Sequence, residues 1–260
     1  MNTVTNLESS VHTPSAIARL LEELSWGGKL GADRLRGGGR YLENVLTAEV
    51  LQALDFLPRT AFLAQIFRAA SGSDRAREAH AVVAEVATVT VLPGPMACAA
   101  LDPASLTGIE IQPDSIIASP TTYALVEAKR NGSGTFGPHQ LARELAHTLI
   151  VAPPRVPLLL LILHRPPPIR VKTRGVLSLT EAISLSIDNV LAVLHAEGHT
   201  LARDEVLDRV PTSVAWITWS TLRDALGDAV DAFGTGDASI ETSIGRIAGG
   251  AIRAIEWHQR

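Results

Sequence analysis

The chain has 260 residues, of which 46% are apolar and 19% charged, and its net charge is −4 at neutral pH. This composition is ordinary for a globular protein, and the average charge announces no nucleic-acid partner, although a local basic patch is compatible with it. Cys98 is the only cysteine, which excludes an internal disulfide and a cysteine-based zinc cluster and suits a reducing cytoplasm.

The first residues, MNTVTNLESSVHT, have neither the basic start nor the apolar stretch of a signal peptide. The most apolar run, Val156 to Leu163, is eight residues long, whereas a membrane-spanning helix needs about 20. We therefore expect a soluble, cytoplasmic protein without a membrane partner.

Helical patterns dominate the first third of the chain. The predicted helices cover residues 14–26, 41–56, 60–70 and 73–85, and a triple glycine at 37–39 forms a loop between the first two. Strand patterns follow, in EVATVTVLPG, in Ser115 to Ala118 and in Tyr123 to Val126.

The rest of the chain alternates between the two patterns. It predicts a helix from Gly137 to about Ile150, a strand at 156–163, a helix at 179–196, a strand in SVAWITWSTL and a helical tail from about residue 221. These elements predict one α/β domain. Its core would span residues 36–220, with a helical extension at 1–35 and a helical tail at 221–260.

The two short strands before residue 130 form a predicted hairpin with charged ends. If Pro120 and Thr121 are the two loop residues of SPTT, then Asp114 lies opposite Glu127 on the same face, with Cβ atoms about 5 Å apart. A slip of one residue would separate the two acids. Facing carboxylates repel each other, so a divalent cation is the natural compensation, and Lys129 emerges on the same face as Glu127.

This pattern, Pro113-Asp114 followed by Glu127-Ala128-Lys129, resembles the signature of the PD-(D/E)XK nuclease superfamily. The resemblance covers roughly residues 40 to 165. It implies a restriction-endonuclease-like fold, an α/β mixed sheet flanked by helices. It also implies that Asp114 and Glu127, with the backbone carbonyl of Ala128, hold Mg²⁺ or Mn²⁺, and that Lys129 positions the attacking water.

Members of the superfamily often carry an acid on the helix before the motif and a glutamine on the helix after it. Glu43 is the best match for the acid, with Glu49 in reserve, and Gln140 matches the glutamine. The function implied is a metal-dependent deoxyribonuclease of the restriction, repair or phage-defence type, acting on DNA as a homodimer or with a partner protein. RNA or a modified base is a further possible substrate for the same chemistry.

Simpler interpretations stand beside these. The charged hairpin end is also explained by a solvated strand end with an ordinary salt bridge, worth under about 1 kcal/mol. Glu43 also complements its helix dipole, and Gln140 lies near a helix start, where polar residues are common. A different class of function is a catalytically silent binding or scaffold subunit of a nucleic-acid-processing complex, in which the helical ends form the partner interface.

Three groups of basic residues are candidate DNA contacts. They are Arg36 and Arg40 in the loop RLRGGGR, Arg143 on the helix after the hairpin, and Arg170, Lys172 and Arg174 in RPPPIRVKTR. Exposed basic loops need no such role, however, and Arg143 with His147 also fits the wet face of an amphipathic helix. Trp216 and Trp219 are assigned to a strand and to the core or an interface, rather than to base stacking.

Overall fold

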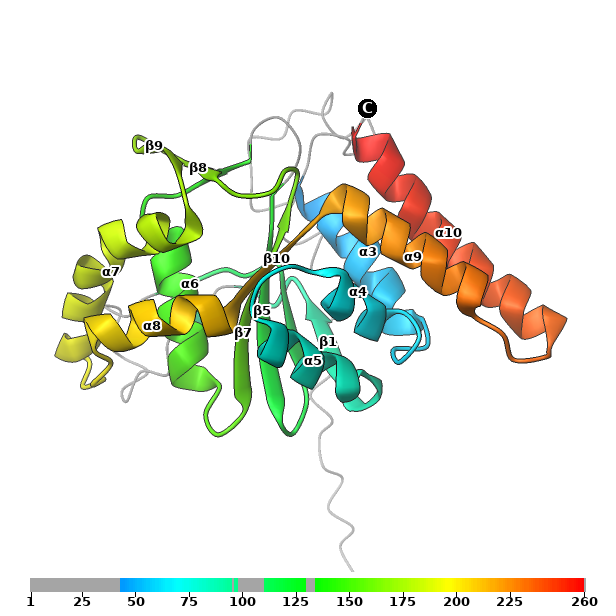
Figure 1. The fold of residues 1–260 in the computed structure, drawn as a ribbon, viewed down its shortest axis with the longest axis horizontal. Coiled ribbons are helices and arrows are strands. Elements are labelled where there is room, and N and C mark those ends of the chain that lie inside the picture. The colour runs from blue at the N-terminus through cyan, green and yellow to red at the C-terminus, as the bar shows by residue number, and fades with distance from the viewer. Residues whose placement is uncertain (1–42, 95, 98–109, 130–133, 260) are drawn as a thin grey trace, which may run out of the picture.

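The computed structural model describes residues 43–94, 96–97, 110–129 and 134–259. Within them the chain has a mixed α/β fold, in which helices cover both faces of a mixed β-sheet (Figure 1). The predicted helix at 14–26 and the glycine loop with Arg36 and Arg40 lie outside the described residues.

In the first two thirds of the chain, the described helices come first, then strands that include a hairpin, then one more helix and a further strand. The helices are α3 (Glu43–Phe56), α4 (Leu63–Ala69), α5 (Asp74–Val82), the 3₁₀ turn η1 (Ala84–Val86), α6 (Gln140–Val151), α7 (Leu179–Ala196), α8 (Arg203–Ser213), α9 (Trp219–Ala232) and α10 (Ala238–Gln259). The strands are β1 (Thr88–Val91), β2 (Met96–Ala97), β3 (Glu110–Ile111), β4 (Ser115–Ala118), β5 (Thr122–Ala128), β6 (Thr135–Phe136), β7 (Val156–Leu163), β8 (Ile169–Val171), β9 (Gly175–Leu177) and β10 (Val214–Thr218).

The main sheet has five strands in the order β1-β4-β5-β7-β10. Strands β1, β4 and β5 pair antiparallel, and β5, β7 and β10 pair parallel. Two smaller sheets pair β2 with β3 and β6 with β8 and β9. All seven residues of β5 are buried, because it lies in the middle of the main sheet and helices cover both of its faces.

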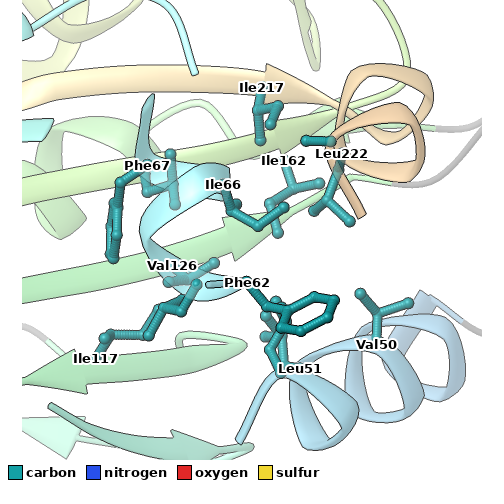
Figure 2. Close-up of a cluster of buried hydrophobic side chains, with 14 of the residues drawn as sticks. Val50, Leu51, Phe62, Ile66, Phe67, Ile117, Val126, Ile162, Ile217 and Leu222 are labelled. Carbon is teal, nitrogen blue, oxygen red and sulfur yellow. The ribbon is translucent and has the colours of Figure 1, made fainter. Parts of the chain in front are cut away.

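The side chains of β7 alternate between two hydrophobic clusters, as the pleat of a strand requires. Leu158, Leu160 and Ile162 belong to a cluster with α3, α4, α5, α9 and α10, part of which Figure 2 shows. Leu159 and Leu161 belong to a second cluster with α6, α7 and α8 on the other face. The eight-residue apolar run is therefore a core strand, and its predicted bounds are confirmed.

Among the described helices, α7 is long and apolar enough by length and composition to cross a membrane. Seven of its residues are buried, and it packs against α6 and α8, as a core helix does. Its bounds match the predicted helix at 179–196, and a capping box between Ser178 and Glu181 begins it.

One sequence prediction is wrong near the end of the sheet, and one helix there was not predicted. SVAWITWSTL is not one strand, because β10 ends at Thr218 and the Thr218 hydroxyl caps α9 by accepting a hydrogen bond from the Thr221 N–H at 3.1 Å. Trp219 therefore begins a helix. Helix α8 was not predicted, since its sequence is strongly polar and contains Pro211.

Candidate functional site

The turn between β4 and β5 sets the register of the site. The Ser119 N–H donates to the Thr122 carbonyl at 2.9 Å, and the Ser119 hydroxyl accepts the Thr121 and Thr122 N–H groups at 3.2 and 3.0 Å. Ile117 pairs with Ala124, as predicted from the SPTT loop. The paired positions end at Ser115 opposite Val126, and Asp114 and Glu127 are the next residues beyond this pair.

Asp114 lies directly before β4 and is bound to β5 by both its backbone and its side chain. Its N–H donates to the Val126 carbonyl at 3.1 Å, and its Oδ2 accepts the Ala128 N–H at 2.7 Å. The residue is only 7% exposed. The carboxylate is thus held against the end of β5, where Glu127 also lies.

Glu127 and Lys129 form a buried ion pair at the same strand end. The Lys129 ammonium donates to Glu127 Oε1, and the two side chains are 13% and 4% exposed, respectively. Residues two apart on a strand share a face, which explains the contact. The alternative of a solvated strand end with an ordinary surface salt bridge is therefore wrong, because Asp114 and Glu127 are both buried.

The backbone of Lys129 is held on both sides. Its N–H donates to the Ile162 carbonyl of β7 at 2.7 Å, and its carbonyl accepts the Trp219 indole N–H at 3.1 Å. Its ammonium lies 5.3 Å from the centroid of the Phe136 ring. Sequence reasoning assigned Trp219 to the core or an interface and missed this contact with the site; the Thr218 cap signal would have placed it at a helix start.

Gln140, at the start of α6, joins the ion pair to a second buried acid. Its Oε1 accepts the Gly137 N–H at 3.1 Å, while its Nε2 donates to Glu127 Oε1 and, at 2.9 Å, to Glu144 Oε1. Sequence reasoning missed Glu144, although a spacing of four residues on a helix sets it on the same face as Gln140.

The site holds more acid than base. Burial raises the pKa of Glu144 well above its usual range, and the negative charges of Glu127 and Asp114 raise it further. The bond from Gln140 and the charge of Lys129 act in the opposite direction. The negative charges of Asp114 and Glu127 outnumber the single ammonium of Lys129, so the group keeps a net negative charge.

This charge and the oxygen donors of Asp114 and Glu127 fit a hard divalent cation such as Mg²⁺. Nowhere in the described residues do three His, Cys, Asp or Glu side chains gather as a metal cluster. A cation here would therefore have two carboxylates, with its other positions left to backbone carbonyl, water or substrate, as Mg²⁺ commonly has. Glu43 is the first residue of α3, but its side chain lies outside what the structure describes; Glu49, the reserve, is exposed on α3.

Three exposed basic residues lie on or beside the hairpin of β8 and β9, which projects from the body of the fold (Figure 1). We call Arg170, Lys172 and Arg174 the basic hairpin cluster. This hairpin is tied to the site, because β8 pairs with β6 and the Lys172 N–H donates to the carbonyl of Phe136 at 2.9 Å. Phe136 in turn contacts Lys129.

The two candidates on α6 differ in position. Arg143 is exposed, as predicted, whereas His147 is 1% exposed and does not lie on a wet face. That part of the prediction is wrong because most of α6 is buried against the second hydrophobic cluster, and burial lowers the pKa of His147 to about 4.

Comparison of the chain with protein-family models, with curated proteins and with solved structures finds no match. Two buried carboxylates, an ammonium paired with one of them and an amide that orients it can together bind a cation and orient a water molecule for attack.

Proposed function

We propose that this protein is a metal-dependent nuclease of the PD-(D/E)XK superfamily that hydrolyses phosphodiester bonds in DNA. The observation that carries the proposal is the convergence of Asp114, Glu127 and Lys129 at one end of β5, where all three are largely withdrawn from water. Gln140 adds a fourth group by bonding directly to Glu127.

The order of elements supports the same assignment. Helix α3 precedes the hairpin of β4 and β5, helix α6 follows it, and the apolar strand β7 then pairs parallel with β5. This is the order that the sequence resemblance implies for a restriction-endonuclease-like fold. The antiparallel and parallel halves of the mixed sheet meet at β5, the strand that carries Glu127.

Each site residue has a role in this reaction. Asp114 and Glu127, with the carbonyl of Ala128, would hold Mg²⁺ or Mn²⁺, which when bound makes water more acidic and neutralises charge on the phosphate. The Lys129 ammonium orients the attacking water and stabilises the negative charge that develops on the phosphoryl oxygens. Gln140 fixes Glu127 Oε1, so that the carboxylate and the ammonium keep one relative orientation.

The basic hairpin cluster supports a polyanionic substrate. Its three cations are exposed and are connected to the site through Phe136, so they can neutralise phosphates of a strand that passes Lys129. DNA rather than RNA follows from the resemblance. Cutting both strands of a duplex would require either two copies of the chain or a partner subunit.

The test is to incubate the protein with plasmid and linear DNA in Mg²⁺, Mn²⁺ or EDTA. Cutting that requires the metal is expected, and Asp114→Asn and Lys129→Ala should each lower its rate by at least about 100-fold. Asp188→Asn, which changes an exposed acid on α7, is the control and should cut at the normal rate. Melting curves establish that each variant is folded at the assay temperature.

Two results together would overturn the proposal: no cutting of any DNA by the unaltered protein, and no rise in its melting temperature with Mg²⁺. The fold would then serve as a catalytically silent binding or scaffold subunit, whose function does not depend on a metal.

A further inference from the structure

A pocket of about 300 Å³ lies beside the site, between the start of α6 and β3. Its lining includes Ile111, Gln112, Pro138, Gln140, Arg143 and Glu144. Two of these, Gln140 and Glu144, belong to the hydrogen-bonded chain that ends at Glu127. The pocket therefore shares a wall with the proposed catalytic group.

Among the residues lining this pocket, His139 and Glu144 each have a buried side-chain atom without a hydrogen-bond partner, and Glu144 is the one of the two that is also bonded to Gln140. It is 2% exposed, and its Oε1 accepts the Gln140 amide, but its buried Oε2 has no hydrogen-bond partner among the described residues. Buried polar atoms in folded proteins nearly always have a partner. An Oε2 atom without a partner, in a residue that lines a pocket, points to a bound group that would supply the missing hydrogen bond.

The size and lining of the pocket indicate what that group is. Its volume is at the small end for sites of small molecules, which suits one ring system. Ile111 and Pro138 contribute apolar side chains to the lining, and Gln140, Arg143 and Glu144 contribute polar ones. A nucleobase has this combination of an apolar face and a hydrogen-bonding edge, and acidic side chains pair with such edges in DNA complexes.

We infer that this pocket takes one unpaired nucleobase next to the phosphodiester bond being cut, and that Glu144 hydrogen-bonds the edge of that base. The inference rests on the proposed function, because the strand being cut is the molecule that the shared wall brings there. A base inside a duplex is stacked and its pairing edge is occupied. The substrate is therefore single-stranded, mismatched or flipped at this nucleotide.

The experiment removes the base from the DNA and the carboxyl of Glu144 from the protein, each alone and then both together. The cut position is first mapped on a labelled single strand with the unaltered protein. Binding is then measured by fluorescence anisotropy in the cleavage-deficient Asp114→Asn background, on strands with one abasic residue at each position around the cut. One abasic position should weaken binding about tenfold, the effect of one buried hydrogen bond with its stacking contact. In Asp114→Asn/Glu144→Ala the same abasic position should weaken binding clearly less than tenfold, because only the stacking contact is then left to lose.

Two further variants keep the result interpretable. Glu144→Gln retains the shape of the side chain and replaces Oε2 by a donor amide, so it should change which base is preferred at that position even if Glu144→Ala does not fold. Asp188→Ala, on the exposed part of α7, should leave the abasic penalty at tenfold.

The outcomes separate the two proposals. If the unaltered protein cuts DNA but no abasic position depends on Glu144, the base pocket is wrong and the nuclease proposal stands. If the protein cuts no DNA and Mg²⁺ does not raise its melting temperature, the nuclease proposal falls and the base pocket falls with it.

Discussion

Replacing Lys129 by methionine should destabilise the protein strongly when no metal is present. The ion pair with Glu127 is largely withdrawn from water on both sides, and the charge of Asp114 adds to the local negative potential. Removing one member of a buried pair leaves an uncompensated charge, which costs about 3–5 kcal/mol. That is a large part of the 5–15 kcal/mol by which domains are typically stable, so urea unfolding at pH 7 in EDTA will resolve it.

Two companion variants identify the cause. Lys129→Met/Glu127→Gln removes both charges and should recover most of the lost free energy of unfolding, because no unpaired charge remains. Arg68→Met breaks the exposed pair with Glu78, whose side chains are 42% and 56% exposed, and should cost under about 1 kcal/mol. If Lys129→Met costs as little as Arg68→Met, the site is solvated and the reasoning from burial is refuted.

Three other outcomes are expected. Trp219→Phe removes the indole N–H that holds the Lys129 carbonyl and shortens one of the largest fully buried side chains; it should lower the unfolding free energy by about 2–4 kcal/mol and the DNA-cutting rate severalfold, and an unchanged rate in the folded variant would show that the contact is not needed. Burial lowers the pKa of His80 to about 4, whereas an unperturbed histidine titrates near pH 6.5. The neutral buried ring therefore contributes its full stability above pH 6.5, and this contribution is lost as the pH falls from 6.5 towards 4. In urea titrations over that interval, the unaltered protein should lose about 3 kcal/mol more of its unfolding free energy than His80→Leu does. Alanine at all three positions of the basic hairpin cluster should reduce the slope of log affinity for DNA against log salt by up to about 2–3, and an unchanged slope would exclude the cluster as a phosphate contact.

The local features of the site were predictable because they depend on neighbouring residues. A serine and a proline in SPTT fix a two-residue loop, and the alternation of a strand then carries the register from that loop to Ser115 and Val126, directly beside Asp114 and Glu127. Lys129 follows from the same alternation. The buried strand β7 was equally clear, since an uninterrupted apolar run bounded by prolines fits few other structures.

The rest of the site depends on packing between distant segments. Glu144 becomes part of it only because α6 lies against the face of β5 that carries Glu127, and helical spacing alone does not reveal which face that is. Trp219 contacts Lys129 across 90 residues of sequence. Helix α8 has too few apolar residues to show a helical hydrophobic periodicity. Its Val206 and Val210 are buried mainly by their neighbours in the second hydrophobic cluster.

The acidic residues gather at the end of β5, and this position explains how the fold tolerates their charge. Three carboxyls beside one ammonium oppose folding, yet β5 is paired on both sides and buried at every residue, so its backbone has little freedom to move the charges apart. The bonds from Ile162 and Trp219 hold Lys129 in the same way just beyond the strand. Unfavourable charge held by an otherwise consistent core is typical of functional sites. A bound cation would relieve that charge without moving the backbone, so Asp114→Asn should lose both the stabilisation by Mg²⁺ and the cutting of DNA.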